Sequence, residues 1–469
     1  MLLSDLIADI EGVLDANQID PEINRVIHDS REVVEGDIFC CLRGENTDGH
    51  QYIQEAIDSG ASAILAEEAS GFNIPTFLVG NVRTVLPRVA SRIVGNPSKE
   101  ISVVGITGTN GKTSVVSMLA EILRTHGIST ATIGTLTGLL TTPESPELQR
   151  ELRKYCSDGV EVVAMEVSSH SLVQKRVDET YFSTVAFTNL SHDHLDFHGK
   201  MESYYQAKGL LFSRKFSEKA VIATDSEYGR SYFEKASSTG MEVEAFSIKN
   251  RNVVFEQKSS SFDWRGERVT IPLGGPFALA NALLSAEIAI QLGLGIQDII
   301  PGLNSLNVIR GRFESVPVTQ EVSAIIDYAH TPSALAELLE GCRKIVNGRI
   351  ILVFGCGGDR DSEKRPLMGE VASMGADVNI LTSDNPRGED AEKIINEILS
   401  GMVVKPLIVE VDRKTAIEEA VNEAESGDLI VIAGRGHEEY QEIQGKAIPF
   451  SDRAVLLDVI SKASSLGER

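Results

Sequence analysis

A glycine-rich loop between a predicted strand and a predicted helix constrains the fold of this chain most strongly. Residues 105–113 read Gly-Ile-Thr-Gly-Thr-Asn-Gly-Lys-Thr. They follow a β-branched run at 101–104, and apolar residues recur at helical spacing from 115 to 123. Glycines let the backbone wrap closely round an anion, and the start of a helix offers free N–H groups. The segment therefore predicts a phosphate-binding loop where a buried strand turns into a helix.

The loop departs from the usual P-loop spacing, because Ile106 stands where the first glycine is expected. The alternative to a phosphate site is a glycine-rich turn without a ligand. The Gly-Lys-Thr step favours phosphate binding, since Lys112 adds a positive charge and Thr113 offers a hydroxyl group to magnesium. The candidate nucleotide-binding residues of the loop are Gly108, Thr109, Asn110, Gly111, Lys112, Thr113 and Ser114.

Strand and helix patterns alternate through three blocks of the 469-residue chain. Long β-branched strands between helices are typical of mostly parallel sheets that are covered on both faces. We predict an α/β fold with a smaller N-terminal domain at 1–98, a central doubly wound P-loop-type domain at 99–304 and a C-terminal Rossmann-like domain at 305–469. The predicted strands include residues 37–42, 61–65, 76–79, 101–104, 160–167, 184–187, 220–224, 324–327, 350–354, 378–382 and 429–433.

The charge and cysteine content limit the partners and the compartment. A formal net charge of −24 disfavours nucleic acid or an anionic membrane surface as the main partner. The five cysteines show no metal-ligand spacing and indicate reduced thiols in the cytoplasm. No apolar run reaches the length of a membrane span, and the first residues lack the basic start of a signal peptide. We expect a cytoplasmic protein that acts as a monomer on small molecules.

Two further clusters follow predicted strands of the central block. Glu166 closes one strand, where its carboxylate suits a magnesium ion, although a carboxylate there can also cap the next helix. Residues 189–198 hold three histidines and two aspartates. That density allows a zinc site or a purely structural network, but the phosphate loop calls for a cation that prefers oxygen ligands, so we favour magnesium.

The motifs together resemble the Mur ligase family, over nearly the whole chain and in the right order. Within that family the resemblance is to the ligases that add diaminopimelate. The residues that carry it are Thr-Gly-Thr-Asn-Gly-Lys-Thr (107–113), Glu-Val-Ser-Ser-His (166–170), Asp-His-Leu-Asp-Phe-His (193–198), Tyr-Tyr-Gln-Ala-Lys (204–208), Gly-Arg-Phe-Glu (311–314), Asp-Tyr-Ala-His-Thr-Pro (327–332), Gly-Gly-Asp-Arg-Asp (357–361), Asp-Asn-Pro-Arg (384–387) and Gly-Arg-Gly-His-Glu (434–438).

The resemblance implies an ATP- and magnesium-dependent amide ligase of peptidoglycan precursor synthesis. ATP would phosphorylate the D-glutamyl carboxylate of UDP-MurNAc-L-Ala-D-Glu, and the amine of meso-2,6-diaminopimelate would attack the acyl phosphate. It implies that Lys112 holds phosphates and that Thr113, Glu166 and His194 organise magnesium. Lys208 matches a carbamylated lysine that supplies a carboxylate-like ligand, whereas without the resemblance it reads as a surface lysine on a helix.

The resemblance also assigns residues to the nucleotide and to the sugar-peptide. Asn281, Arg312, Asp327 and His330 match positions that hold adenine, ribose and phosphates. Residues matching the UDP-sugar peptide site are Ser30, Thr141, Thr142, Ser168, Gln174 and Arg176. The chain departs from the family pattern at two positions, with His192 where arginine is common and Arg435 where lysine is common.

The segment Asp384, Asn385, Pro386 and Arg387 predicts the amino acid that is added. Proline stiffens the turn after a strand, so Arg387 is aimed into the ligand crevice, where a guanidinium grips the second carboxylate of meso-diaminopimelate. The alternative is that Arg387 pairs with Glu389 or Asp390 on the helix start. By resemblance, Arg360, Gly434 and Glu438 complete this site. A ligase for L-lysine or another amino acid, and a non-catalytic nucleotide-binding module, are the alternative functions.

Overall fold

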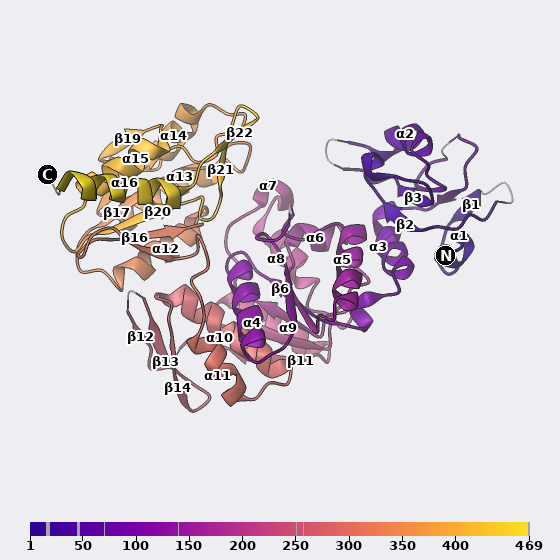
Figure 1. Ribbon diagram of the computed structural model, residues 1–469, viewed down its shortest axis with the longest axis horizontal. Coiled ribbons are helices and arrows are strands. Elements are labelled where there is room, and N and C mark those ends of the chain that lie inside the picture. Colours follow the sequence, from indigo (N-terminus) through magenta and orange to yellow (C-terminus); the bar gives the residue numbers. More distant parts are fainter. Residues whose placement is uncertain are drawn as a thin grey trace. The chain divides into compact units, whose positions relative to one another are not determined.

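The computed structural model describes residues 1–15, 19–44, 47–69, 71–138, 140–249, 251–256 and 258–467. These residues form two compact units. The first unit comprises residues 1–108, 127–187 and 206–245, and the second comprises residues 109–126, 188–205 and 246–469. Figure 1 labels the helices and strands of both. Of the helices in the described ranges, none combines the length and the apolar character needed to span a bilayer.

The first unit begins with a five-stranded sheet in the order β1-β5-β4-β3-β2. Only β1 runs antiparallel to its neighbour, and both faces of the sheet are covered. Helices α1 and α3 supply apolar residues to one face, and α2 supplies them to the other. The elements are α1 (Leu3–Ile7), β1 (Val13–Asp15), β2 (Arg25–Ile27), β3 (Asp37–Cys40), α2 (Ile53–Asp58), β4 (Ala63–Ala66), β5 (Thr76–Leu78) and α3 (Val82–Ile93).

A six-stranded sheet in the order β11-β10-β9-β6-β8-β7 carries the glycine-rich loop after its central strand β6. The strands from β7 to β10 are parallel, as the sequence predicts. Its strands, and the helices of the same unit, are β6 (Ser102–Thr107), β7 (Thr130–Ile133), α5 (Ser145–Ser157), β8 (Val162–Glu166), α6 (Ser169–Val173), β9 (Thr184–Phe187), β10 (Lys219–Ala223), α9 (Glu227–Ser238) and β11 (Glu242–Phe246). Helix α5 also packs against α3, which joins the two sheets of this unit.

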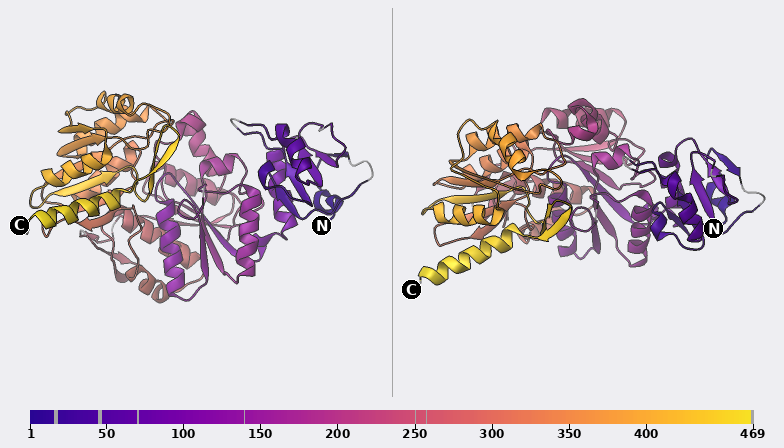
Figure 2. Two further views of the ribbon diagram at one scale, coloured as in Figure 1. Left: turned by 45° about the horizontal axis from the view of Figure 1, so that its top comes forward. Right: turned by 90° about the horizontal axis from the view of Figure 1, so that it is seen from above.

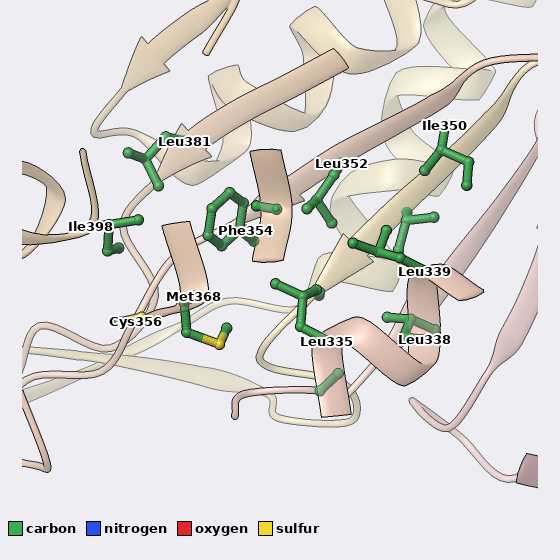
Figure 3. Close-up of a cluster of buried hydrophobic side chains, with 14 of the residues drawn as sticks. Leu335, Leu338, Leu339, Ile350, Leu352, Phe354, Cys356, Met368, Leu381 and Ile398 are labelled. Carbon is green, nitrogen blue, oxygen red and sulfur yellow. The ribbon is translucent and has the colours of Figure 1, made fainter. Parts of the chain in front are cut away.

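The second unit contains a six-stranded sheet in the order β15-β16-β20-β17-β18-β19, in which only β15 is antiparallel. Helices α12, α13 and α14 cover one face, where leucines of α12, Met368 of α13 and isoleucines of α14 meet the strand residues Ile350, Leu352 and Phe354 (Figure 3). Helices α15 and α16 cover the other face. The elements are β15 (Glu314–Pro317), β16 (Ser323–Asp327), α12 (Pro332–Arg343), β17 (Ile350–Phe354), α13 (Lys364–Gly375), β18 (Val378–Thr382), α14 (Ala391–Leu399), β19 (Ile408–Glu410), α15 (Arg413–Glu423), β20 (Leu429–Ala433) and α16 (Asp452–Gly467).

The same unit holds the helix that follows the glycine-rich loop, with two small antiparallel sheets. Helix α4 packs against α10 and α11, and α16 is the yellow helix that ends at the C-terminus in Figure 2. These elements are α4 (Lys112–Thr125), α7 (Leu195–His198), β12 (Val254–Phe255), β13 (Ser260–Trp264), β14 (Glu267–Ile271), α10 (Pro276–Gln291), α11 (Ile296–Asn304), β21 (Tyr440–Ile443) and β22 (Lys446–Pro449), while α8 (Met201–Gly209) runs from the second unit into the first. The predicted α/β class with doubly covered, mostly parallel sheets is confirmed.

Candidate active site

The glycine-rich loop has the backbone conformation that its sequence predicts. Helix α4 begins at Lys112, and Gly111 immediately before it has a φ of 86°. A Cβ atom added to Gly111 would lie 2.5 Å from Oδ1 of Asn281 on α10. A larger residue would therefore be strained and would collide with the neighbouring helix, so glycine is required here.

Residues of the 188–205 segment hold the loop from the side. The Thr109 and Asn110 N–H groups donate to the main-chain and side-chain oxygens of Asn189, at 2.8 and 2.9 Å. The Thr109 hydroxyl lies 3.1 Å from the buried Tyr204 hydroxyl. The Thr188 hydroxyl donates to the Asn110 carbonyl at 2.6 Å. The loop is thus fixed before a ligand binds, which lowers the entropic cost of holding phosphate.

A cavity of about 430 Å³ opens beside this loop in the second unit. Six of the residues predicted to bind the nucleotide line it: Asn110, Gly111, Ser114, Asn281, Arg312 and Asp327. The remaining wall includes the apolar residues Leu273, Phe277 and Leu338. A cavity that combines apolar walls with fixed polar groups is the usual form of a small-molecule site.

Arg312 and Asp327 are held in place at this cavity. The guanidinium carbon of Arg312 lies 4.4 Å from the centre of the Tyr328 ring, in a cation–π contact. The Asp327 carboxylate accepts the N–H groups of Phe313 at 2.7 Å and Ala329 at 2.8 Å. Burial raises the pKa of Asp327, while Arg312 and these two N–H groups oppose the rise. The Arg312 side chain also reaches 3.5 Å from the Thr113 hydroxyl.

Glu337 is a cavity residue that the sequence did not single out. It lies on α12 and is half-buried. Burial raises the pKa of Glu337 from its ordinary value of 4.5 to about 7, and the neighbouring Glu340 adds to the rise. It lies one helical turn after Ala334, which also lines the cavity, and no pattern in the sequence marked either residue.

His194 and His330, both predicted site residues, surround Asp193 in the second unit. The His194 N–H donates to the Asp193 carboxylate at 2.9 Å, and its ring Nε2 lies 3.3 Å from the same group. Burial alone would raise the pKa of Asp193, but the charges of His194, His330 and Lys364 outweigh it and hold the pKa below its usual range. Burial, followed by the charge of Lys364, lowers the pKa of His330.

The described residues contain no grouping of three histidine, cysteine, aspartate or glutamate side chains suited to a metal ion. His192 stands where the family pattern favours arginine, and its Nε2 lies 3.5 Å from the Asp361 carboxylate. An arginine at this position could pair with the same carboxylate.

Glu166 and Lys208 are both buried in the first unit. The Glu166 carboxylate accepts the Thr135 N–H at 2.9 Å, and a Cβ atom on Gly134 would lie 2.3 Å from its Oε1. Lys208 is 1% exposed and donates to the Gly108 carbonyl at 2.8 Å. Lys208 is therefore not the surface lysine that the bare helix pattern allowed, and its amine lies against the glycine-rich loop.

The residues predicted for the sugar-peptide also lie in the first unit, and three of them, Thr142, Ser168 and Arg176, share hydrogen bonds. The Thr142 hydroxyl donates to the Glu166 carbonyl at 2.9 Å and accepts the Ser168 N–H at 3.1 Å. Arg176 donates to the Thr142 carbonyl at 3.0 Å, and Oε1 of Gln174 is buried with no hydrogen-bond partner among the described residues. The Thr141 hydroxyl lies 3.1 Å from that of Thr135.

Arg83 joins Arg176 around one carboxylate, a pairing that no local pattern of residues indicates. Glu144 is 9% exposed, and its carboxylate lies 3.0 Å from the Arg176 guanidinium and 3.2 Å from that of Arg83. Burial lowers the pKa of Arg176, with Arg83 contributing in the same direction. Ser30 lies apart from this network and donates to Glu55 at 3.1 Å.

The residues predicted for the added amino acid gather at the carboxyl edge of the C-terminal sheet. Asn385 donates to Glu438 at 2.6 Å, and a Cβ atom on Gly434 would lie 2.3 Å from the Asp384 carboxylate. Burial raises the pKa of Glu438, and the charge of Asp384 adds to it. Arg387 donates from Nη1 to the Gly358 carbonyl at 2.6 Å, and its Nε lies 3.6 Å from Glu442.

Neither alternative partner of Arg387 is used. Glu389 instead accepts from Arg365, and Asp390 caps α14. Arg360 is exposed on the neighbouring loop. Arg435, the second departure from the family pattern, is fully buried and donates to the Tyr440 carbonyl.

Comparison with known proteins supplies the remaining evidence. Three protein-family models match the chain: Mur ligase family, catalytic domain, at residues 22–126; Mur ligase middle domain at 106–289; and Mur ligase, glutamate ligase domain, at 311–436. A UDP-N-acetylmuramoyl-L-alanyl-D-glutamate–2,6-diaminopimelate ligase of Chromobacterium violaceum is 41% identical over 95% of this chain and 95% of its own length. Its namesake from Clostridioides difficile is 38% identical over 98% of this chain and all of its own.

The chain belongs to the Mur ligase family.

Solved structures agree with this membership. A structure of a UDP-N-acetylmuramoyl-L-alanyl-D-glutamate–2,6-diaminopimelate ligase matches 99% of each chain with a TM-score of 0.70 at 30% identity. The MurF ligase of Thermotoga maritima in complex with ADP matches with a TM-score of 0.67 over 94% of this chain and 96% of its own, and at 20% identity it supports the fold alone. This Mur ligase is an ATP-dependent ligase with the three-domain α/β architecture of its family.

Proposed function

We propose that this Mur ligase adds meso-2,6-diaminopimelate to the D-glutamate of UDP-MurNAc-L-Ala-D-Glu in cytoplasmic peptidoglycan precursor synthesis. Relatives that are 36–41% identical over nearly the whole chain bear the name of that reaction. The observation that carries the choice of amino acid is the fixed position of Arg387 at the carboxyl edge of the C-terminal sheet. The proposed domains are residues 1–98 for the UDP-sugar, 99–304 for ATP and 305–469 for the amino acid.

Arg387 is fixed by its backbone as well as by its side chain. Its N–H donates to the Glu442 carbonyl at 2.9 Å, and its carbonyl accepts the Gln444 N–H at 2.7 Å. The side chain is one-quarter exposed, so part of the guanidinium remains open to a ligand. A guanidinium fork binds a carboxylate by two parallel hydrogen bonds. Meso-diaminopimelate has such a second carboxylate, whereas the side chain of L-lysine ends in an ammonium group that Arg387 would repel.

The acidic groups beside Arg387 suit the ammonium groups of the same ligand. The charge of Asp384 contributes to the raised pKa of Glu438. A bound ammonium would oppose this effect and favour the charged form of Glu438. We also assign Arg360, Asn385, Pro386 and Gly434 to the proposed binding site for the amino acid.

For the phosphates we propose Lys112 and the loop N–H groups as ligands, with Asn281, Arg312, Asp327 and His330 holding the rest of ATP. The shape of the loop and the residues of the cavity beside it support this assignment. The Lys112 amine lies at the start of α4, 2.9 Å from the Thr109 carbonyl. At this position its positive charge can stabilise the negative charge that develops while the terminal phosphoryl group is transferred.

For magnesium we propose Thr113, Glu166 and His194 as ligands, together with Lys208 once carbon dioxide has added to its amine. Carboxylate, hydroxyl and carbamate oxygens fit a hard cation. Glu166 is 1% exposed, and its carboxylate accepts the Thr135 N–H at 2.9 Å. Bound magnesium would neutralise phosphate charge; the protein contributes by positioning the groups that carry it.

For the nucleotide-sugar peptide we propose Ser30, Thr141, Thr142, Ser168, Gln174 and Arg176 as ligands. The unsatisfied Gln174 oxygen and the half-buried Arg176 guanidinium support this assignment, because the oxygen can accept a substrate N–H group and the guanidinium can donate to a carboxylate. Arg83 and Arg176 share the Glu144 carboxylate.

The proposed reaction has two steps. The D-glutamyl carboxylate attacks the terminal phosphorus of ATP, so the bond to ADP breaks and an acyl phosphate forms. The amine of diaminopimelate then adds to the acyl carbon, loses a proton, and expels inorganic phosphate as the amide forms. The protein contributes by holding the reactants together and by stabilising the developing charge.

The experiment measures phosphate release with UDP-MurNAc-L-Ala-D-Glu and ATP, alone and with meso-diaminopimelate, L-lysine or L-ornithine. We expect release only when meso-diaminopimelate is present, with one tripeptide product per phosphate. Equal release with L-lysine would overturn the assigned amino acid. Absence of release with every amino acid would favour a non-catalytic nucleotide-binding role.

A further inference from the structure

Two neighbouring loops carry the proposed amino-acid ligands, and they are bonded to each other along their length. The first is residues 357–361, which carries Arg360, and the second is residues 384–390, which carries Arg387. Their mutual hydrogen bonds run from Gly358 N–H to the Asn385 carbonyl at 2.8 Å, from Arg387 Nη1 to the Gly358 carbonyl at 2.6 Å, from Gly388 N–H to Asp359 at 2.9 Å, and from Asp359 N–H to Glu389 at 2.6 Å.

The two loops are held together against local backbone preference. Asp359 has a φ of 50° and Arg387 a φ of 51°, a region that residues other than glycine rarely adopt. A Cβ atom on Gly358 would lie only 2.0 Å from the Pro386 carbonyl oxygen. Strained conformations of this kind persist only where the surroundings impose them. The geometry of the site therefore depends on what anchors the pair of loops.

Arg365 on α13 is that anchor. Its side chain is 1% exposed. Nη2 donates to the Gly357 carbonyl at 3.2 Å and to Glu389 at 2.8 Å, and Nη1 donates to Glu389 at 3.0 Å and to Glu397 of α14 at 2.6 Å. The single guanidinium of Arg365 thus joins both loops to the helices α13 and α14.

The bonds of Glu389 extend this anchor to the backbone. The same carboxylate that accepts from both terminal nitrogens of Arg365 also accepts the Asp359 N–H. The hydrogen bonds of Arg365, with that N–H, hold the pKa of Glu389 down at about 2, so the carboxylate is charged at any pH at which the enzyme works. A bidentate guanidinium–carboxylate pair is both strong and directional.

We propose that Arg365 is a positioning residue that sets the affinity for the incoming amino acid by fixing these two loops as one rigid surface. The inference rests on the proposed function only in taking these loops as the amino-acid site. Arg365 does not touch the nucleotide cavity lining. Its removal should therefore weaken amino-acid binding while it leaves the binding of ATP unchanged.

Arg349 provides a matched control in the same sheet. It also donates to two carboxylates, Asp428 at 2.8 Å and Glu423 at 3.0 Å, but it precedes β17 at the amino end of the strands. Arg349→Met removes a comparable set of bonds far along the strands from the loops. It separates loss of stability from loss of loop geometry.

The experiment compares steady-state kinetics of Arg365→Met, Arg365→Lys and Arg349→Met in the full-length enzyme, with unfolding temperatures measured in parallel. Arg365→Met should raise KM for the amino acid at least about tenfold and change KM for ATP by less than about twofold, following the usual cost of truncating a buried charge pair. Arg365→Lys keeps the charge and should recover part of the loss. Arg349→Met should lower the unfolding temperature without raising KM for the amino acid.

The proposal fails if Arg365→Met leaves KM for the amino acid unchanged, or if Arg349→Met raises it equally. If Arg365→Met does not fold, Glu389→Gln decides: a tenfold rise in the same KM supports the proposal and an unchanged KM overturns it. All comparisons use whichever amino acid the unmodified enzyme prefers. A preference for L-lysine would therefore refute the proposed substrate while it leaves the test of Arg365 intact.

Discussion

Replacing Glu337 by glutamine should stabilise the protein at pH 8 and change its stability little at pH 5. Glutamine keeps the size and shape of the side chain and removes only its charge. We choose Glu337 because its half-buried side chain lines the nucleotide cavity and because burial raises its pKa from 4.5 to about 7. The cost of charging it in the folded protein is therefore the quantity that the substitution measures.

The sign and size follow from the two pKa values. A carboxyl with a raised pKa binds its proton more tightly in the folded protein, so it favours folding most below pH 4.5. That contribution is lost as the pH rises through about 7. The difference between these two pKa values lowers the free energy of unfolding by about 3 kcal/mol at pH 8 and by less than about 1 kcal/mol at pH 5. Water in the cavity screens the charge, so about 3 kcal/mol is an upper limit.

Urea unfolding followed by circular dichroism from pH 5 to pH 8 measures the effect as a difference between the variant and the unmodified protein. Other titrating groups cancel in that difference. The matched control is Glu340→Gln, which removes the exposed neighbour and should shift stability by at most a few tenths of a kcal/mol between pH 5 and pH 8, because Glu340 is the smaller cause of the raised pKa of Glu337. A difference for Glu337→Gln that does not grow between pH 5 and pH 8 would refute the reasoning.

Three further predictions concern the proposed chemistry. Lys208→Ala should nearly abolish turnover, with partial recovery in added formate or acetate, because the carbamate would be the missing ligand; a normal kcat would remove Lys208 from the mechanism. Lys112→Ala and Glu166→Ala should each lower kcat by at least about a hundredfold, and Glu166→Ala should also raise the magnesium requirement, as magnesium titrations would show. Arg387→Ala should raise KM for meso-diaminopimelate by at least about thirtyfold, since a lost partner in a charge pair costs about 2–5 kcal/mol, while KM for ATP stays the same.

Local patterns in the sequence were sufficient for the loop and the strands. The strand, the glycines and the following helix each follow from neighbouring residues, so their order could be predicted, but the predicted strand ended at residue 104, whereas β6 continues through Gly105 to Thr107. The strands at 184–187, 350–354 and 429–433 have the predicted bounds for the same reason.

Contacts between distant residues could not be predicted from such patterns. Asn281 meets the loop from 170 positions away in the chain, and only the family resemblance pointed to it. Glu337 looks like an ordinary helix residue until α12 is placed beside the cavity. The pairing of Arg83 with Glu144 spans 61 positions and carries no local signal. In each case the position depends on tertiary packing, which residue spacing does not encode.

The central claim is that this Mur ligase selects meso-diaminopimelate through a fixed guanidinium. The most direct test gives the enzyme ATP, UDP-MurNAc-L-Ala-D-Glu and equal concentrations of meso-diaminopimelate and L-lysine, and measures the two products by mass spectrometry. The ratio of products equals the ratio of kcat/KM values. We predict an excess of at least about thirtyfold for the diaminopimelate product, from the cost of about 2 kcal/mol or more for an unmatched charge. Equal amounts of the two products would contradict the account.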